Sequence, residues 1–76
     1  MLKIIFARTT EDGEGSCEVG EVPSPEAADE KMMSMFVNFC RDVSHGPLER
    51  EHYANGFEWT YKGVKYSLHY TSKEVS

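Results

Sequence analysis

Residues 57–68 read FEWTYKGVKYSL, and this stretch decides the fold. Large apolar residues alternate with polar ones on both sides of Lys62-Gly63, which is the pattern of two strands with one buried face. A two-residue loop at Lys62-Gly63 joins the strands as a β-hairpin. All six large side chains then lie on one face, in the pairs Tyr61–Val64, Trp59–Tyr66 and Phe57–Leu68.

The sequence before the hairpin predicts one long helix, residues 25–44. Ser24 is a good N-cap, Pro25 suits the first helical position, and Gly46-Pro47 ends the helix. Because a helix this long needs a buried face, Phe36 and the hairpin residue Trp59 should both be largely buried. The stripe expected to face the sheet is Ala28, Met32, Met35, Phe36, Phe39 and Val43.

The opening residues predict a second hairpin. Leu2, Ile4 and Phe6 share one face of a strand whose other face is also partly apolar, which is typical of a central strand. Residues 11–15 contain Asp-Gly and predict a turn. A shorter strand should follow at 16–22 and end at Pro23, with Cys17 and Val19 facing inward.

The expected fold is therefore an α+β domain of hairpin, helix and hairpin (ββαββ): a four-stranded antiparallel sheet with one helix packed on one face. It occupies residues 1–76 as one domain, with a frayed tail at 72–76. Residues 48–54 fit either a loop or an edge strand, and the pattern does not specify the strand order. A domain of this length has a stability on the order of 3–5 kcal/mol.

Charge is concentrated in one segment. The net charge is −5, and residues 11–30 hold eight acids and no Lys or Arg. This acidity argues against double-stranded DNA as a partner and favours a basic protein surface, or serves only solubility. No apolar run is long enough to span a membrane, and two cysteines are too few for a small secreted scaffold, so we expect a cytoplasmic protein with reduced thiols.

Catalytic and metal-binding patterns are weak. Structural zinc sites bring ligands in close pairs, whereas Cys40 and His45 have no matching second pair. The same two residues lack the orienting third group that a nucleophile needs. We therefore expect no catalytic residue, no metal and no cofactor, and a small enzyme is the least favoured alternative. Further possible metal ligands are Cys17, His52 and His69, and possible acid–base carboxylates are Glu49, Glu51 and Glu58. Surface or core roles account for these residues.

The helix has a wider apolar surface than one sheet face covers. Met33, Val37 and Cys40 extend its apolar arc from roughly 100° to roughly 200°. Two explanations remain open: residues 48–54 fold over this side of the helix, or a partner or a second copy of the chain covers it. Burying Met33 and Val37 would contribute roughly 1.5–3 kcal/mol each, which is comparable to the stability of the whole domain.

These observations predict a non-catalytic protein-binding module acting through the acidic segment and the helix. Its composition resembles that of small phage- or mobile-element-encoded inhibitors, and the resemblance implies an antagonist that occludes a host enzyme. The partner is another protein, a second copy, or both. The residues expected to bind it are Glu11, Asp12, Glu14, Glu18, Glu26, Glu30, Met33 and Val37.

The alternative hypothesis is a single-stranded nucleic-acid binder. An aromatic sheet face flanked by lysines stacks bases without reading sequence. The C-terminal hairpin offers Tyr53, Phe57, Trp59, Tyr61, Tyr66 and Tyr70 beside Lys62, Lys65 and Lys73. Filling a small core accounts for most of these aromatic residues equally well.

Overall fold

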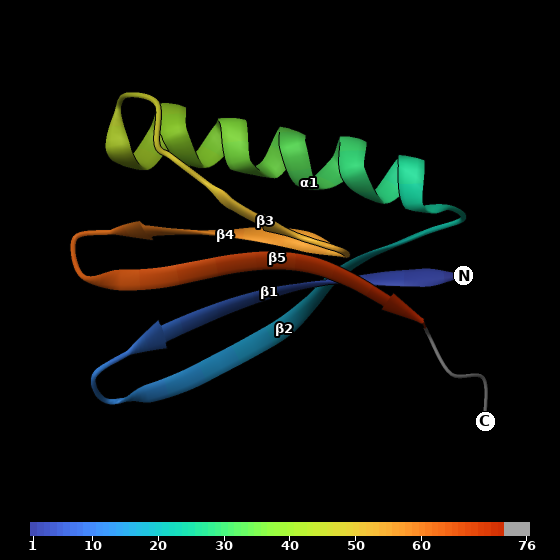
Figure 1. Cartoon of the computed structure of the whole chain (residues 1–76), viewed down its shortest axis with the longest axis horizontal. Coiled ribbons are helices and arrows are strands. Elements are labelled where there is room, and N and C mark those ends of the chain that lie inside the picture. The colour runs from blue at the N-terminus through green and yellow to red at the C-terminus, as the bar shows by residue number, and fades with distance from the viewer. Residues whose placement is uncertain (73–76) are drawn as a thin grey trace.

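A computed structural model describes residues 1–72 and shows an α+β fold (Figure 1). One helix lies across one face of a five-stranded antiparallel sheet, whose strand order is β2-β1-β5-β4-β3. The elements are β1 (Leu2–Thr10), β2 (Gly13–Val22), α1 (Pro25–Phe39), a π-helical turn η1 (Cys40–Ser44), β3 (Glu51–Tyr53), β4 (Gly56–Tyr61) and β5 (Val64–Ser72).

The α+β class and the single helix were predicted, but the number of strands was wrong. The fifth strand is β3, three residues that pair with the start of β4 at one edge of the sheet. All three β3 residues are exposed, so neither face of this strand needed an apolar pattern. The alternation that revealed the other strands was therefore missing here.

The C-terminal hairpin forms in the predicted register. Tyr61 pairs with Val64, Trp59 with Tyr66 and Phe57 with Leu68. Lys62 and Gly63 have φ angles of 51° and 79°, the left-handed values that a two-residue turn requires. The hairpin places its aromatic row against α1, where Trp59 is 3% exposed and Phe36 6% exposed, as expected. Their ring centroids lie 4.9 Å apart in an edge-to-face arrangement.

The helix begins where predicted and changes geometry near its end. The Ser24 hydroxyl accepts a hydrogen bond from the Ala27 backbone N–H at 3.2 Å. After Phe39 the hydrogen bonds widen into η1, which ends at His45 with a left-handed φ of 57°. This wider turn takes Val43 off the α-helical stripe. The prediction that Val43 faces the sheet was therefore wrong, and Val43 is 43% exposed.

The first hairpin departs from the prediction in the length of its turn and in the position of Cys17. Only Glu11 and Asp12 form the turn, and β2 already begins at Gly13. An irregularity in pairing between Ile4 and Ile5 makes a bulge in this ladder. Cys17 lies opposite Phe6 but is exposed, so its predicted inward position was wrong; Figure 1 shows this end of the hairpin diverging from α1.

The core lies between α1 and the middle of the sheet. The strand β1 is central, as predicted, because it pairs with β2 on one side and β5 on the other. Ser72 ends β5, and the rest of the tail expected to fray lies outside the described residues. The buried core is Ile4, Val22, Ala28, Met32, Phe36, Phe57, Trp59 and Leu68.

Candidate functional site

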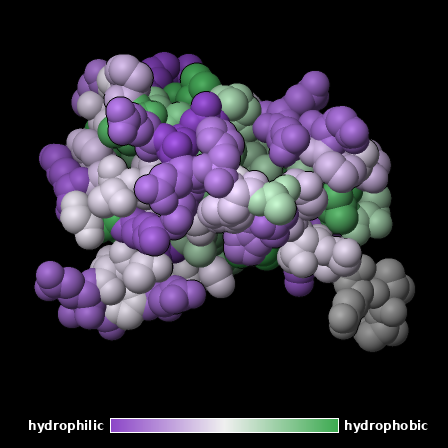
Figure 2. All heavy atoms as spheres, in the orientation of Figure 1, coloured by the Kyte–Doolittle hydropathy of each residue, from purple (hydrophilic) through white to green (hydrophobic). Residues whose placement is uncertain are grey.

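An open side of α1 is the most unusual surface of the molecule. We call Met33, Val37 and Cys40 the α1 flank. Met33 and Val37 are 40% and 52% exposed, whereas Cys40 is half-buried and packs against the core. Figure 2 shows hydrophobic atoms at the surface, among hydrophilic ones, along the upper edge of the molecule. In Figure 1, which has the same orientation, α1 runs along this edge.

Residues 46–54 cover the α1 flank only in part. They return from the end of the helix to the sheet and leave a groove between themselves and α1, which we call the flank groove. One part, of about 480 Å³, lies beside Val37, Cys40 and Leu48. A second part, of about 340 Å³, lies beside Met33 and Tyr53. The first of the two explanations weighed from the sequence therefore holds in part: the segment shields Cys40 and leaves Met33 and Val37 open.

Arg50 stands between the two parts of the flank groove. Its guanidinium carbon lies 4.6 Å from the ring centroid of Phe36 and 4.9 Å from that of Phe57. Its Nη1 also donates to the Met33 sulfur at 3.3 Å. Cation–π contacts of this kind hold a guanidinium over apolar surface. Arg50 thereby fixes the floor of the groove and the position of the Met33 side chain.

The eight residues predicted to bind a partner do not form one surface, although all eight are exposed. Glu11, Asp12, Glu14 and Glu18 lie on the β1–β2 turn and on β2, at one edge of the sheet. The α1 flank faces the opposite edge, where β3 lies. Of the eight residues, only the four on α1 share a surface with the α1 flank: Glu26, Glu30, Met33 and Val37.

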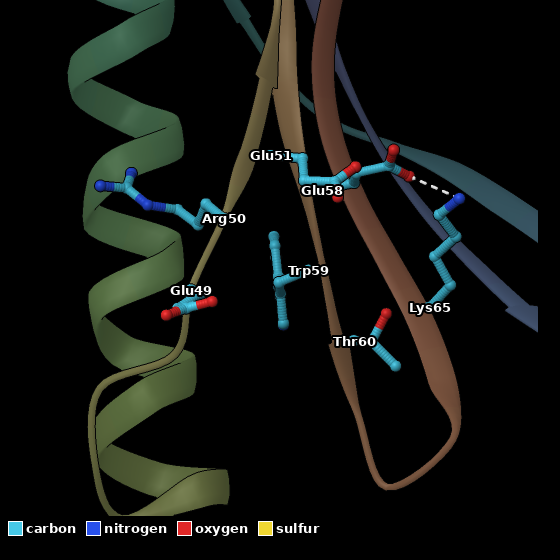
Figure 3. A pocket seen from close by; sticks show the side chains of 7 residues that line it. All are labelled: Glu49, Arg50, Glu51, Glu58, Trp59, Thr60 and Lys65. Carbon is cyan, nitrogen blue, oxygen red and sulfur yellow. Dashed lines mark ion pairs between the residues drawn. The ribbon is translucent and has the colours of Figure 1, made fainter.

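A second, charged hollow of about 390 Å³ opens beside Trp59 and Thr60, in the part of β4 that does not pair with β3 (Figure 3). Glu51 lies directly opposite Glu58 in the strand register. Lys65 Nζ lies 3.0 Å from Glu58 Oε2, and this hydrogen bond, with the nearby Glu58 and Glu51 charges, raises the pKa of Lys65. Figure 3 shows Arg50 turned away from this hollow, toward α1. Lys65 thus offsets the repulsion between two facing carboxylates, which is a structural role.

The possible catalytic and metal-binding residues remain scattered. Within residues 1–72, no group of three or more His, Cys, Asp or Glu side chains has the geometry to hold a metal ion. In the same part of the chain no hydrogen bond joins the side chains of Cys40 and His45. His45 is exposed, and the Cys40 carbonyl accepts from the Gly46 backbone N–H at 3.1 Å. These residues close the end of the helix.

The aromatic row of the C-terminal hairpin faces α1 and not the open side of the sheet. Phe57 and Trp59 are buried, and Tyr66 and Tyr70 pack against the core. Part of the open face is lined instead by small and charged side chains: Ala7, Thr9, Glu14, Glu58, Lys65, Ser67 and His69, with Tyr53 and Asn55 at the margin.

Folding of residues 48–54 over this side of the helix was one of the two explanations left open by the sequence, but the residues that form the second wall of the flank groove were not identified. Pro47, Leu48 and Arg50 line it, yet none of them belongs to a periodic element. The available signal was the helix stop at Gly46-Pro47, since a chain that reverses there and must reach the sheet has to run back along the helix.

Comparison with known proteins adds no family. No family model, no curated protein and no solved structure matches this chain. Among residues 1–72, no helix is long and apolar enough to cross a membrane. The α+β fold and the open flank groove are therefore the features of this protein that bear on its function.

Proposed function

We propose that this protein is a non-catalytic protein-binding module whose binding surface is the α1 flank with its groove. The observation that carries this proposal is the exposure of Met33 and Val37, one helical turn apart and beside an apolar hollow. Exposed apolar side chains that gather beside an apolar hollow and are bordered by polar groups mark protein-interaction sites.

Met33 and Val37 contribute a modest apolar free energy to binding. Fully burying Met33 and Val37 is worth roughly 1.5–3 kcal/mol each. Since each is already about half covered, association recovers about half of that amount. Glu26 and Glu30 continue the same helical side toward its N-terminus, so acidic groups flank the apolar patch and orient a basic part of the partner.

We further propose that the protein acts by occlusion, covering a surface that its partner uses, and that it does so in the cytoplasm. Cys17 and Cys40 are free, and Cys17 is exposed. An exposed free thiol persists in a reducing compartment. An inhibitor of a host enzyme would act in this way.

No specific observation favours single-stranded nucleic acid. That hypothesis relied on the aromatic residues of the C-terminal part of the chain, and all of them but Tyr53, which is 42% exposed, pack on the side of the sheet that faces α1. The net charge of −5 also opposes binding to a phosphate backbone.

Site-specific photo-crosslinking in cells tests the proposed function. A photoreactive amino acid replaces Val37 in one variant and Val43 in a matched control, because Val43 is 43% exposed but does not line the flank groove. We expect discrete protein adducts from position 37, lost when Met33→Asp is added, and none from position 43. Equal adducts from both positions, or none from position 37, would contradict the proposal.

A further inference from the structure

The outer edge of β2 is a second candidate interaction surface, apart from the α1 flank. We call residues 13–18, the half of β2 nearest the β1–β2 turn, the β2 edge. We propose that the β2 edge takes up an extended, lysine- or arginine-rich segment of another protein as a sixth strand of the sheet. This inference does not depend on the α1 flank, because the two surfaces lie at opposite edges of the sheet.

The β2 edge has the geometry that strand addition requires. β2 is the first strand in the sheet order, so within residues 1–72 it pairs with β1 alone. All six residues of the β2 edge are exposed. They pair with β1 without a shift in register, because the bulge lies beyond them. Six extended residues span about 20 Å, which is enough for the main-chain hydrogen bonds that hold an added strand.

Alternate residues of the β2 edge turn their backbone groups outward. Thr10 and Gly13 flank the two-residue turn and form the first pair of the ladder. Hydrogen-bonded and non-hydrogen-bonded pairs alternate from there, so Glu14 and Ser16 turn their N–H and C=O away from β1. In Figure 1 this end of β2 lies at the lower margin of the molecule, away from α1. An incoming strand therefore finds backbone donors and acceptors at an accessible edge.

The β2 edge lacks most of the features that keep sheet edges from pairing. Proteins protect an edge with lysine, proline, a bulge, a very short strand or a covering segment. No residue of the β2 edge is lysine or proline, whereas the opposite edge strand, β3, has only three residues. The monomer does not require glycine at position 15, where φ is not left-handed and nothing lies within 4 Å of an added Cβ. Glycine within a strand often marks the close approach of another backbone.

Charge selects the occupant of the β2 edge. Residues 11–22 contain five acids and no Lys or Arg. Opposite charges on paired strands stabilise the pair, and like charges destabilise it. A second copy of β2 would bring five more acids to the same edge, so pairing between copies is disfavoured. One-signed charge thus keeps copies apart while it admits a basic segment.

Glu14 is the acid best placed to meet a basic side chain of the added strand. It lines a hollow of about 420 Å³ on the sheet face away from α1. Lys65 lines the same hollow, but its Nζ lies 3.0 Å from Glu58 Oε2, so its charge is already paired. Basic residues at every second position of the added strand would lie on this face and reach Glu14 across the strand pair.

Titration of the ¹⁵N-labelled protein, followed by NMR, tests the proposal. The probe is an eight-residue peptide that alternates threonine and lysine, with blocked termini, in about 0.15 M salt to screen long-range attraction. The control peptide has glutamate in place of lysine. We expect saturable shifts centred on the β2 edge, slower exchange of the Glu14 and Ser16 amide hydrogens, and no shifts with the control. Shifts centred elsewhere, or no saturation up to about 1 mM, would overturn the proposal.

A proline variant separates backbone pairing from charge attraction. Ser16→Pro removes an outward N–H, and proline is tolerated at such an edge position. Its affinity for the lysine peptide should fall by about fivefold to tenfold, whereas Ser16→Ala, which keeps the N–H, should change it by less than about twofold. A folded Ser16→Pro protein that binds as tightly as the wild type would overturn strand addition. If the proline variant does not fold, the charge variants below decide the proposal.

A matched pair of charge reversals tests the position of the contact. Glu14→Lys should weaken binding of the lysine peptide by roughly threefold to tenfold. Glu49→Lys makes the same change in net charge at an exposed residue just before β3 and should weaken it by less than about twofold. Equal losses would show that the peptide responds only to net charge, which would overturn the proposal. Met33→Asp should leave this affinity unchanged, so failure of the β2 edge and failure of the α1 flank are separate results.

Discussion

At Gly56 the sheet leaves no room for a side chain. This residue pairs with His69, and an added Cβ would collide with the Leu68 carbonyl oxygen and lie 2.7 Å from His69 Cα. Backbone atoms cannot move aside as a flexible side chain does. We expect Gly56→Ala to lower the free energy of unfolding by about 2–3 kcal/mol, measured by urea denaturation. The control Gly15→Ala, where nothing lies within 4 Å of the added Cβ, should change it by less than about 0.5 kcal/mol. Equal losses at both glycines would contradict this account of β4.

At the scale of an element, the start of α1 depends on one side chain. Ser24 accepts the hydrogen bond of the Ala27 N–H, one of the N–H groups that a helix leaves without an internal partner. Ser24→Ala should therefore lower the free energy of unfolding by about 1 kcal/mol, and Ser24→Asp should retain most of it. Thermal unfolding followed by far-ultraviolet circular dichroism measures both variants. An alanine variant as stable as the aspartate variant would show that the cap contributes nothing.

The elements also show how far sequence reasoning reaches. The C-terminal hairpin and the start of α1 could be predicted because alternation, turn residues and capping all agree there. For β3 the sequence left a loop and an edge strand equally open, because its three exposed residues carry no apolar pattern. The exposure of Cys17 could not be predicted either, because burial of a residue on β2 depends on where α1 crosses the sheet.

The candidate site was predictable in its helical half only. Met33 and Val37 stood out because they lie outside the stripe that the sheet needs. The acidic residues Glu11 and Glu14 were grouped with them because they are close in sequence, but strand order places β2 at the sheet edge away from the flank. The return of residues 48–54 along the helix was one of two open explanations, whereas the contacts of Arg50 with Phe36 and Phe57 are tertiary and no local pattern encodes them.

At the scale of the whole molecule, the core is small compared with the apolar surface that α1 leaves exposed. The core contains only eight buried apolar residues among those described, so apolar surface left open on α1 is a large fraction of what the chain can bury. A partner bound at the flank would stabilise the folded state by mass action. Under the proposed function, the free energy of unfolding and the binding of a partner are therefore linked through Met33 and Val37.

The central claim is that Met33 and Val37 form an interface and are not part of the monomer core. Urea denaturation of the wild type and of Val37→Asp tests it most directly, because a charge costs little at an exposed position and a great deal in a buried core. We predict that the free energy of unfolding of Val37→Asp lies within about 0.5 kcal/mol of the wild-type value. A loss of about 2 kcal/mol or more would place Val37 in the core of the monomer and contradict the claim.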